Sequence, residues 1–242
     1  MSPFRLLSIT GLVLLGAGFL GRGILPSPGR LSPLVLQEPQ QTPTDPRVFP
    51  VHVGDVDYRI EPLFDYDIAG LVVSLHDSAT WWDTIHADAN DHLNVADLCL
   101  VWGENAASGA YRHMRFHNAQ FTCYFSYDDE RLVRREDTRA VSNNHLLTVD
   151  AAVARAIRGL RVGDQVRLRG RLANYRHDAG FSFYRGTSTT RDDAGCEIIL
   201  IDQMDVLGRA PLWPRALTWG GVLLLLAALV VWYRTPNGAR DW

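Results

Sequence analysis

An uncharged, apolar stretch near the C-terminus constrains the fold of this chain more than any other feature. Residues 216–233 carry no charge, they include four leucines in a row, and Arg215 and Arg234 bracket them. Tryptophans stand near both ends of the stretch, where the interfacial aromatics of membrane helices lie. A core helix of a soluble protein does not normally carry aromatics at both rims. We therefore predict a transmembrane helix over residues 213–234, followed by a short tail over residues 235–242.

A second apolar stretch lies at the N-terminus. Residues 6–20 are uncharged and follow Arg5, and the stretch is shorter than the roughly 20 residues that a spanning helix needs. Its length also suits the core of a signal peptide, which is about 7–15 residues long. No clean cleavage site follows, so residues 1–25 are predicted to be an uncleaved membrane anchor or signal anchor. The arginines are spread over both sides of the two stretches and leave the orientation open.

One domain is predicted between the two apolar stretches. The chain has 242 residues, and domains usually run to roughly 100–200 residues. Residues 26–50 are rich in proline and glutamine and are predicted to form an extended spacer, ahead of a soluble domain over residues 51–209. The signal-like start and the spacer favour export. The predicted location is the bacterial inner membrane, with the domain on its periplasmic or extracytoplasmic side.

The basic residues and the cysteines exclude several classes of function. All 24 basic side chains are arginine, which excludes Schiff-base chemistry and a P-loop lysine. The three cysteines are too few for a disulfide framework and show no C-x-x-C spacing. Cys99 lies in an apolar run and is predicted to be a buried thiol. Cys123 and Cys196 lie in or beside predicted strands and could pair only in an oxidising compartment, so the disulfide state stays open.

Alternating and β-branched runs predict a mainly β domain of the α+β class. Val166, Leu168 and Leu172 alternate with three arginines, so this segment is predicted to be a strand with one apolar and one basic face. A helix is predicted just before it. The predicted elements are strands over residues 51–58, 67–76, 98–102, 119–127, 166–172 and 197–206, and a helix that starts near Thr148 or Asp150 and ends at Gly159 or Gly163.

Three strands, a helix and two further strands resemble the order of an OB-fold, a small Greek-key barrel. The run Phe-Thr-Cys-Tyr-Phe at residues 121–125, the element Gly163-Asp-Gln-Val with Gly170, and the start of the last strand at Cys196 resemble the OB-fold branch related to tRNA anticodon-binding domains. This resemblance covers residues 121–206. It implies an OB-like Greek-key barrel with one helix between strands 3 and 4. The order of anchor, domain and anchor, with Trp-Gly-Glu-Asn and Ser-Asn-Asn-His elements, also resembles bacterial membrane-anchored envelope proteins.

Polar and aromatic side chains in three predicted loops form the candidate ligand-binding set. The Ser-Asn-Asn-His run either contacts a ligand or only caps a turn and a helix. The Arg-Gly-Thr run either cups an anion or is an ordinary polar hairpin, and the tryptophan pair either contacts a partner or packs in the core. The candidate residues are His76, Asp77, Trp81, Asn143, Asn144, His145, Arg185 and Thr187.

Histidines and carboxylates gather in one polar segment without the spacing of a metal motif. His76, His86, His92 and Asp97 show neither H-x-x-x-H nor H-E-x-x-H, and metal ligation needs three or four such groups to converge. No metal site and no cofactor are therefore predicted.

Arg167, Arg169 and Arg171 form the only basic stripe in the sequence. OB-folds bind single-stranded nucleic acid with a positive groove and stacking aromatics. The simpler interpretation is a solvated strand face paired with acids from residues 128–137. Because an exported domain rarely meets nucleic acid, nucleic acid is not the expected partner.

These observations predict a non-enzymatic binding or assembly module of the bacterial cell envelope, held in the membrane by two spans. Its expected partner is another envelope protein or an envelope polymer. The alternative is an envelope hydrolase that uses polar loops around His76, His92 and His145, which requires these imidazoles to converge. A nucleophilic pair of Cys123 and His145 is disfavoured because strand cysteines with apolar neighbours are usually inert, and no catalytic residue is assigned. A second alternative is a cytoplasm-facing OB domain that binds nucleic acid.

Overall fold

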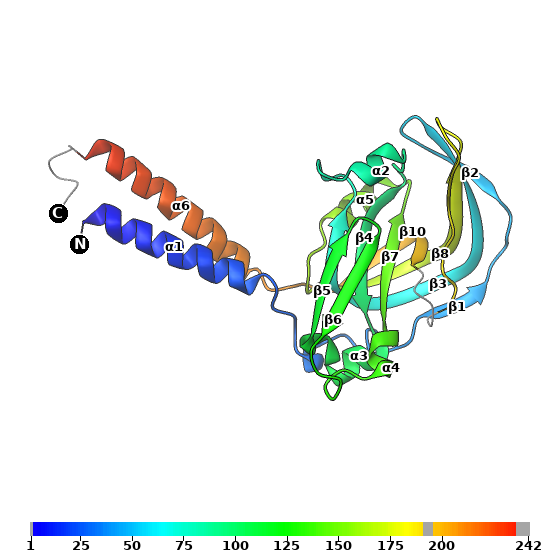
Figure 1. Ribbon diagram of the computed structural model, residues 1–242, viewed down its shortest axis with the longest axis horizontal. Helices are drawn as coiled ribbons and strands as arrows, with labels where there is room; N and C mark the ends of the chain where they lie inside the picture. The colour runs from blue at the N-terminus through cyan, green and yellow to red at the C-terminus, as the bar shows by residue number, and fades with distance from the viewer. Residues whose placement is uncertain (1, 191–195, 236–242) are drawn as a thin grey trace. The chain divides into compact units, whose positions relative to one another are not determined.

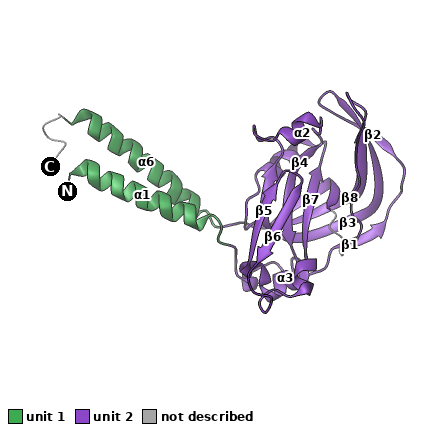
Figure 2. Cartoon of the chain, in the orientation of Figure 1, with its two compact units in different colours: residues 1–24, 211–242 green, residues 25–210 purple. Residues whose placement is uncertain are grey.

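The computed structural model describes residues 2–190 and 196–235. It divides the chain into two compact units, one made of the two ends of the chain and the other of residues 25–210 (Figure 2).

The first unit is a pair of helices that lie side by side (Figure 1). Helices α1 (Pro3–Gly21) and α6 (Trp213–Arg234) are both long and apolar enough to cross a membrane. Glycines let their backbones approach closely: a Cβ atom on Gly221 would lie 2.6 Å from the carbonyl oxygen of Gly11. Such small-residue contacts are typical of helix pairs in membranes. The predicted bounds of the C-terminal helix are confirmed.

The second unit is a mixed α+β domain built on one large sheet and one hairpin (Figure 1). Within the described residues the sheet consists of β1 (Gln40–Pro43), β2 (Phe49–Val53), β3 (Val56–Asp77), β4 (Asn94–Val101), β7 (Val141–Leu147), β8 (Gln165–His177), β9 (Phe183–Arg185) and β10 (Glu197–Gly208). The hairpin consists of β5 (Met114–Ala119) and β6 (Thr122–Tyr127).

The strand pairings of the sheet form a closed order that begins and ends at β3. The long strand β3 pairs with β8 over its first part and with β4 over its last part. Strand β4 pairs with β7, β7 with β10, and β10 with β8, and of these only the β7–β10 pair is parallel. Gly170 lies where the strands bend against each other. A Cβ atom there would lie 2.0 Å from the carbonyl oxygen of Leu200, so only glycine fits.

Short helices connect the strands. They are α2 (Thr84–Asp88), α3 (Gly103–Ser108), α4 (Arg135–Arg139) and α5 (Ala151–Arg158), with 3₁₀ turns η1 (Pro28–Arg30) and η2 (Ala110–His113). Helix α5 is the predicted helix. The side chain of Asp150 accepts hydrogen bonds from the N–H groups of Ala152 and Val153, and Gly159 caps the other end. Its residue Ile157 is buried against the sheet.

The main core lies on one face of β3, β4, β8 and β10. Ile68, Leu98, Leu168 and Ile199 are all buried in it. The predicted two faces of β8 are confirmed, because Val166 and its apolar neighbours point into this core while the arginines between them lie at the surface.

Residues 26–50, expected to be a spacer, pack onto the domain. Leu31 and Val35 are buried in an apolar cluster. The backbone N–H of Ser32 donates to Gln165 Oε1 at 2.6 Å, and β1 pairs with β3. Apolar side chains inside a proline-rich segment explain the difference: burial of these side chains stabilises the packed conformation.

The prediction of one strand over residues 119–127 is wrong. A two-residue turn at Gln120 and Phe121 breaks the segment, and β6 pairs with β5 outside the large sheet. The Ser-Asn-Asn-His run, expected to be a loop, belongs to β7, the neighbour of β4 in the sheet. Its polar side chains have low strand propensity, and hydrogen bonds to neighbouring strands and loops offset their burial.

Candidate functional site

Polar residues from three neighbouring strands line up on one face of the sheet. Asp97 in β4 lies directly opposite His76 in β3 and opposite His145 in β7. Directly paired residues share a face, and this face lies opposite to the apolar core. All three side chains are buried. The loop that follows β3 and the hairpin β5–β6 add further partners.

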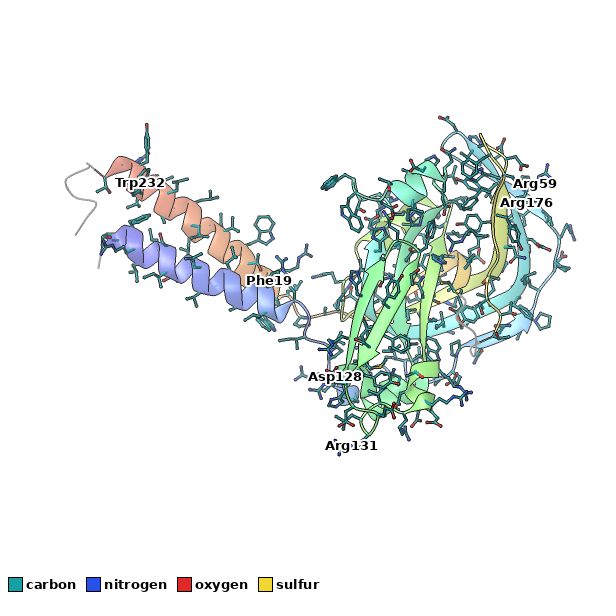
Figure 3. The ribbon with its side chains drawn as sticks, viewed as in Figure 1. Phe19, Arg59, Asp128, Arg131, Arg176 and Trp232 are labelled. Atoms are coloured by element: carbon teal, nitrogen blue, oxygen red, sulfur yellow. A yellow bond between two sulfur atoms is a disulfide. The ribbon has the colours of Figure 1, made fainter. Side chains whose placement is uncertain are left out.

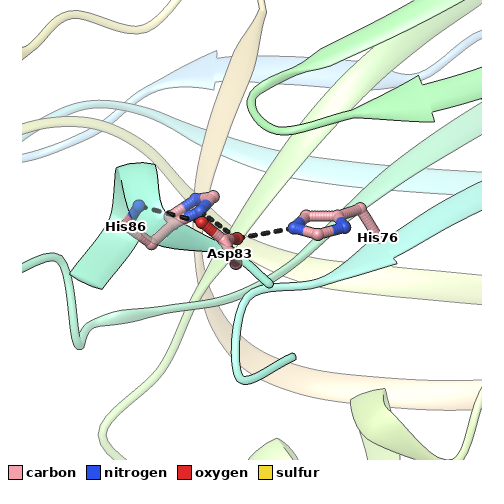
Figure 4. Close-up of side chains that lie close together, drawn as sticks. All are labelled: His76, Asp83 and His86. Atoms are coloured by element: carbon pink, nitrogen blue, oxygen red, sulfur yellow. Dashed lines mark hydrogen bonds and ion pairs between the residues drawn. The ribbon is translucent and has the colours of Figure 1, made fainter. Parts of the chain in front are cut away.

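Asp83 joins two of the histidines (Figure 4). Its Oδ2 atom lies 2.6 Å from His76 Nε2 and 2.6 Å from His86 Nδ1. Asp83 is the N-cap of α2, and its Oδ1 atom accepts the backbone N–H of His86. Burial raises the pKa of Asp83, but the hydrogen bond from His76 and those from His86 outweigh it and hold the pKa below its ordinary value.

Asn94 and Asp97 carry the network on to His145. Asn94 Nδ2 lies 2.8 Å from His86 Nε2 and 2.9 Å from Asp97 Oδ1. Asp97 Oδ1 in turn lies 2.6 Å from His145 Nδ1. Burial raises the pKa of Asp97, but the charge and the hydrogen bond of His145 outweigh burial and lower the pKa below its ordinary value. The carboxylate therefore stays ionised.

The partners fix the position of the protons in this network. A carboxylate only accepts, so Asp97 faces the NH₂ group of Asn94. The same NH₂ group faces His86 Nε2, which must therefore be the acceptor nitrogen. The proton of His86 then lies on Nδ1 and is donated to Asp83. By the same reasoning, the His145 Nδ1–H donates to Asp97.

His76, Asp83 and His86 are residue types that bind metal ions, and they lie close together. One ligand atom from each lies within 4.8 Å of the others, which is close enough to hold an ion. A metal on His86 Nδ1 would move the proton of this histidine to Nε2, where it would meet the NH₂ group of Asn94. The contacts of these three side chains therefore fit hydrogen bonds between them better than they fit a bound metal ion.

A free thiol lies at the other end of the network. Cys196 directly precedes β10 and is partly exposed, and its Sγ donates to the carbonyl oxygen of Phe121 at 3.7 Å. Asn143 Nδ2 donates to its sulfur at 3.5 Å, and Arg185 Nη2 lies 3.0 Å from His145 Nε2. The guanidinium only donates, so with His145 neutral this nitrogen is an acceptor beside the thiol.

The environment favours transfer of the thiol proton to the imidazole. Burial raises the pKa of Cys196, but the hydrogen bond and the charge of His145 outweigh it and lower the pKa. Burial and the charge of Arg185 lower the pKa of His145, but the charge and hydrogen bond of Asp97 and the hydrogen bond of Cys196 together outweigh them and raise it to about 9. Both shifts favour a thiolate beside an imidazolium, a form in which His145 Nε2 carries a proton and Arg185 no longer donates to it.

The cysteine pairing differs from the prediction. Cys99 and Cys123 form a disulfide that joins β4 to β6, and Cys196 is free. Cys99 is therefore not the buried free thiol that was predicted, and the pairing of Cys123 with Cys196, which the sequence left open, does not form. The reason is geometric, because Cys99 lies on the polar face of β4, to which the hairpin β5–β6 is joined. The thiol beside His145 is Cys196, whereas Cys123 cannot act as its nucleophile.

Phe121, at the tip of the hairpin, covers the network. Its N–H donates to Asp97 Oδ2 at 2.9 Å, and its carbonyl accepts from Asn143 Nδ2 at 3.0 Å. Its ring lies 3.9 Å from the His86 ring and 4.0 Å from the Arg185 guanidinium carbon. Phe121 has a φ of 63°, which is rare for a bulky residue. Four contacts to the network hold it in this conformation.

Four of the candidate ligand-binding residues lie in this network: His76, Asn143, His145 and Arg185. The other four lie elsewhere. Asp77 pairs with Arg158, Trp81 is 94% exposed, Asn144 bonds within the sheet, and Thr187 Oγ1 accepts the backbone N–H of Ile198. His92, one of the three histidines of the hydrolase alternative, is exposed and lies outside the network.

Sequence reasoning missed Asp83, Asn94 and Cys196 as members of the site. The spacing of Asp83 three residues before His86, at a helix start, was the available signal. Asn94 and Cys196 reach the site only through the pairing of distant strands, which no local pattern reveals.

The three arginines of the basic stripe in β8 are paired with acids. Arg167 binds Asp67, Arg169 binds Asp205, and Arg171 binds Asp202, at 2.6 to 3.0 Å. The acids come from β3 and β10 and not, as expected, from residues 128–137. The stripe therefore offers little free positive charge for a nucleic acid.

Comparison of the chain with protein-family models, with curated proteins and with solved structures gave no match.

Proposed function

We propose that this chain is a membrane-anchored thiol hydrolase, with Cys196 as nucleophile, His145 as general base and Asp97 as the residue that positions the imidazole. The series of carboxylate, imidazole and free thiol carries the proposal: Asp97 Oδ1 lies 2.6 Å from His145 Nδ1, and Asn143 Nδ2 lies 3.5 Å from both His145 Nε2 and Cys196 Sγ. A nucleophile beside a base that a third group orients is the arrangement of enzymes with covalent acyl intermediates. The non-enzymatic binding module stays a prediction.

The chemistry follows from these positions. His145 Nε2 takes the proton of Cys196, and the thiolate attacks the carbonyl carbon of an ester, thioester or amide. The developing oxyanion is stabilised by donors beside the sulfur, the Asn143 amide and the Arg185 guanidinium. When the bond to the leaving group breaks, His145 returns the proton to that group. Water, deprotonated by His145, then cleaves the thioester, releases the acid and restores the thiol.

The same proposal takes the five strands β3, β4, β7, β10 and β8 as an OB-type barrel. Three features support it: the ring of pairings, the parallel β7–β10 pair, and the position of α5 between β7 and β8 in the chain. The Phe-Thr-Cys-Tyr-Phe run, part of the resemblance, lies in the hairpin turn and in β6, outside this ring, so that part of the resemblance does not support the barrel.

The proposed location is the extracytoplasmic side of the bacterial inner membrane, with α1 and α6 as two spans. The disulfide between Cys99 and Cys123 supports it, because disulfides persist in oxidising compartments. A cysteine at exposed Asp55, introduced together with Cys196→Ser, tests the location. Labelling by an impermeant thiol reagent in spheroplasts is expected. Labelling only after lysis would place the domain in the cytoplasm.

Acylation of the thiol tests the activity. The full chain in detergent is mixed with p-nitrophenyl acetate, and the acetylated protein and the released nitrophenol are followed by mass spectrometry and absorbance. The wild type is expected to acetylate at Cys196 and to turn over. His145→Gln is expected to lower the rate by about 10²-fold or more, the usual contribution of a general base.

The exposed pair of His52 and Asp57, 2.8 Å apart, offers a matched control. His52→Gln removes a histidine beside an aspartate without touching the site, and its rate should equal that of the wild type. Turnover that survives Cys196→Ser, or equal rates in His145→Gln and the wild type, would rule out the proposed chemistry.

A further inference from the structure

A small cavity lies at the surface of the domain, on strands β3, β8 and β9. Its volume is about 220 Å³, below the roughly 300–1,000 Å³ of pockets for drug-sized ligands. It therefore fits one ring-sized chemical unit. Its lining consists of Val48, Arg59, Glu61, Asn174, Tyr175, Arg176 and Tyr184.

Two arginines of this lining face each other without an acidic partner. Arg59 in β3 pairs directly with Arg176 in β8, and both side chains are exposed (Figure 3). Like charges opposite each other destabilise a sheet. In the part of the chain that the structure describes, no carboxylate forms an ion pair with either one, although the three arginines earlier in β8 each have one.

The nearest acids on the same face are already engaged. Asp57 lies 2.8 Å from His52, and Glu61 accepts a hydrogen bond from Asn174 at 3.0 Å. Asn174 is itself held by the backbone N–H of Thr187, which donates to its Oδ1 at 2.9 Å. The polar wall of the cavity is thus fixed in place, while the two guanidinium groups remain available to a ligand.

The chemistry of the lining defines the ligand. Two guanidinium forks recognise the oxygens of a phosphate or a carboxylate. The Tyr184 side chain is largely exposed at the rim and presents an aromatic face, and Glu61 retains oxygens that can accept hydroxyl groups. We propose that this cavity is a binding subsite for one acidic sugar unit, a saccharide that bears a phosphate or a carboxylate.

The inference does not depend on the proposed hydrolase. Tyr184 and Arg185 are consecutive in β9, so their side chains point to opposite faces of the strand. Arg185 reaches His145, whereas Tyr184 lines the cavity. If Cys196 were not acylated, the proposal of a sugar subsite would be unaffected. If no sugar bound, the proposal of a thiol hydrolase would be unaffected.

Calorimetric titration of the full chain in detergent tests the subsite. The probes are glucuronic acid, glucose 6-phosphate, inorganic phosphate and neutral glucose. The two acidic sugars are expected to bind, more weakly at high salt, and glucose is not. Arg59→Gln and Arg176→Gln are each expected to weaken binding at least tenfold, and Tyr184→Ala is expected to weaken the sugars but not inorganic phosphate.

Arg131 provides the matched control, because it is an exposed arginine paired only with Asp129 (Figure 3). Arg131→Gln should bind the acidic sugars as the wild type does, and thermal melting verifies that every variant is folded. Absence of binding by all probes, or equal losses in Arg131→Gln and Arg176→Gln, would overturn the proposal. Inorganic phosphate that binds as tightly as glucose 6-phosphate would overturn the assignment to a sugar.

Discussion

The two faces of β4 are both buried, yet they are built in opposite ways. One face contributes Leu98 and Leu100 to the main core. The other carries Asp97 and Cys99, and a hairpin and a loop cover it. The apolar face needs only volume and shape, whereas each polar group on the other face needs a partner of the right kind at the right place. One face of β4 therefore contributes to the stability of the core, and the other positions the polar groups of the proposed site.

Replacement of Asp97 should have the largest effect. Asp97→Ala leaves His145, Asn94 and the N–H of Phe121 without their shared acceptor. Removal of one partner of a buried charged pair destabilises by about 3–5 kcal/mol. Chemical denaturation should show this loss, and Cys196 should react as an ordinary thiol in the folded fraction. A loss below about 1 kcal/mol would show that the polar face tolerates an unpaired group.

Replacement on the apolar face should affect stability alone. Leu98→Ala is expected to lower the free energy of unfolding by about 2–5 kcal/mol, because it leaves a cavity in the core. The reactivity of Cys196 at a temperature where the protein is folded should not change. A shift in the pH dependence of that reactivity would contradict the separation of the two faces.

Removal of the disulfide should loosen the polar face more than the apolar one. The bond closes a loop with a sequence separation of 24, and such loops stabilise by about 3 kcal/mol. The Cys99→Ala, Cys123→Ala double variant should lose this amount. Hydrogen exchange should increase in β5 and β6 first. Uniform exchange across the sheet would show that the hairpin is no separate cover.

The pH dependence isolates the contribution of His145. Its pKa is raised to about 9 in the folded state, above the ordinary histidine value of about 6.5. A raised pKa contributes stability below the unfolded value, and this is lost as the pH rises towards the folded value. In Cys196→Ser, where the thiol does not titrate, stability should fall by on the order of 1–3 kcal/mol between about pH 6.5 and 9. His145→Gln in the same background should remove the fall.

The smallest expected effects concern the surface arginines and have opposite signs. Arg176→Gln removes a like-charge neighbour of Arg59 and should raise the free energy of unfolding by about 0.2–1 kcal/mol. Arg169→Gln removes a partly exposed pair with Asp205 and should lower it by up to about 1 kcal/mol. If thermal melting showed that both variants change the stability in the same direction, the distinction between paired and unpaired arginines would be contradicted.

Local patterns predicted the elements that local physics determines. The apolar run of α6, the Asp150 cap of α5 and the two faces of β8 could all be derived from neighbouring residues. The turn at Gln120 and Phe121 could not, because Phe121 adopts a conformation that its side chain disfavours and that contacts from distant strands stabilise.

The polar site was only partly predictable for the same reason. His76, Asn143, His145 and Arg185 drew attention as polar residues, but the sequence did not indicate that β3, β4 and β7 would bring them together. The disulfide from Cys99 to Cys123 likewise depends on where a hairpin folds over a strand. The residues that meet in these contacts are far apart in the sequence, so no local pattern predicts the contacts.

The pH profile of Cys196 alkylation measures directly whether His145 and Asp97 activate this thiol. The full chain, in which Cys196 is the free cysteine, reacts with iodoacetamide over a range of pH, and mass spectrometry measures the rate. The expected midpoint lies below that of a free thiol, about 8.5, and it should shift to higher pH in His145→Gln and Asp97→Asn but not in His52→Gln. A midpoint at or above that of free cysteine in the wild type would contradict an activated thiol.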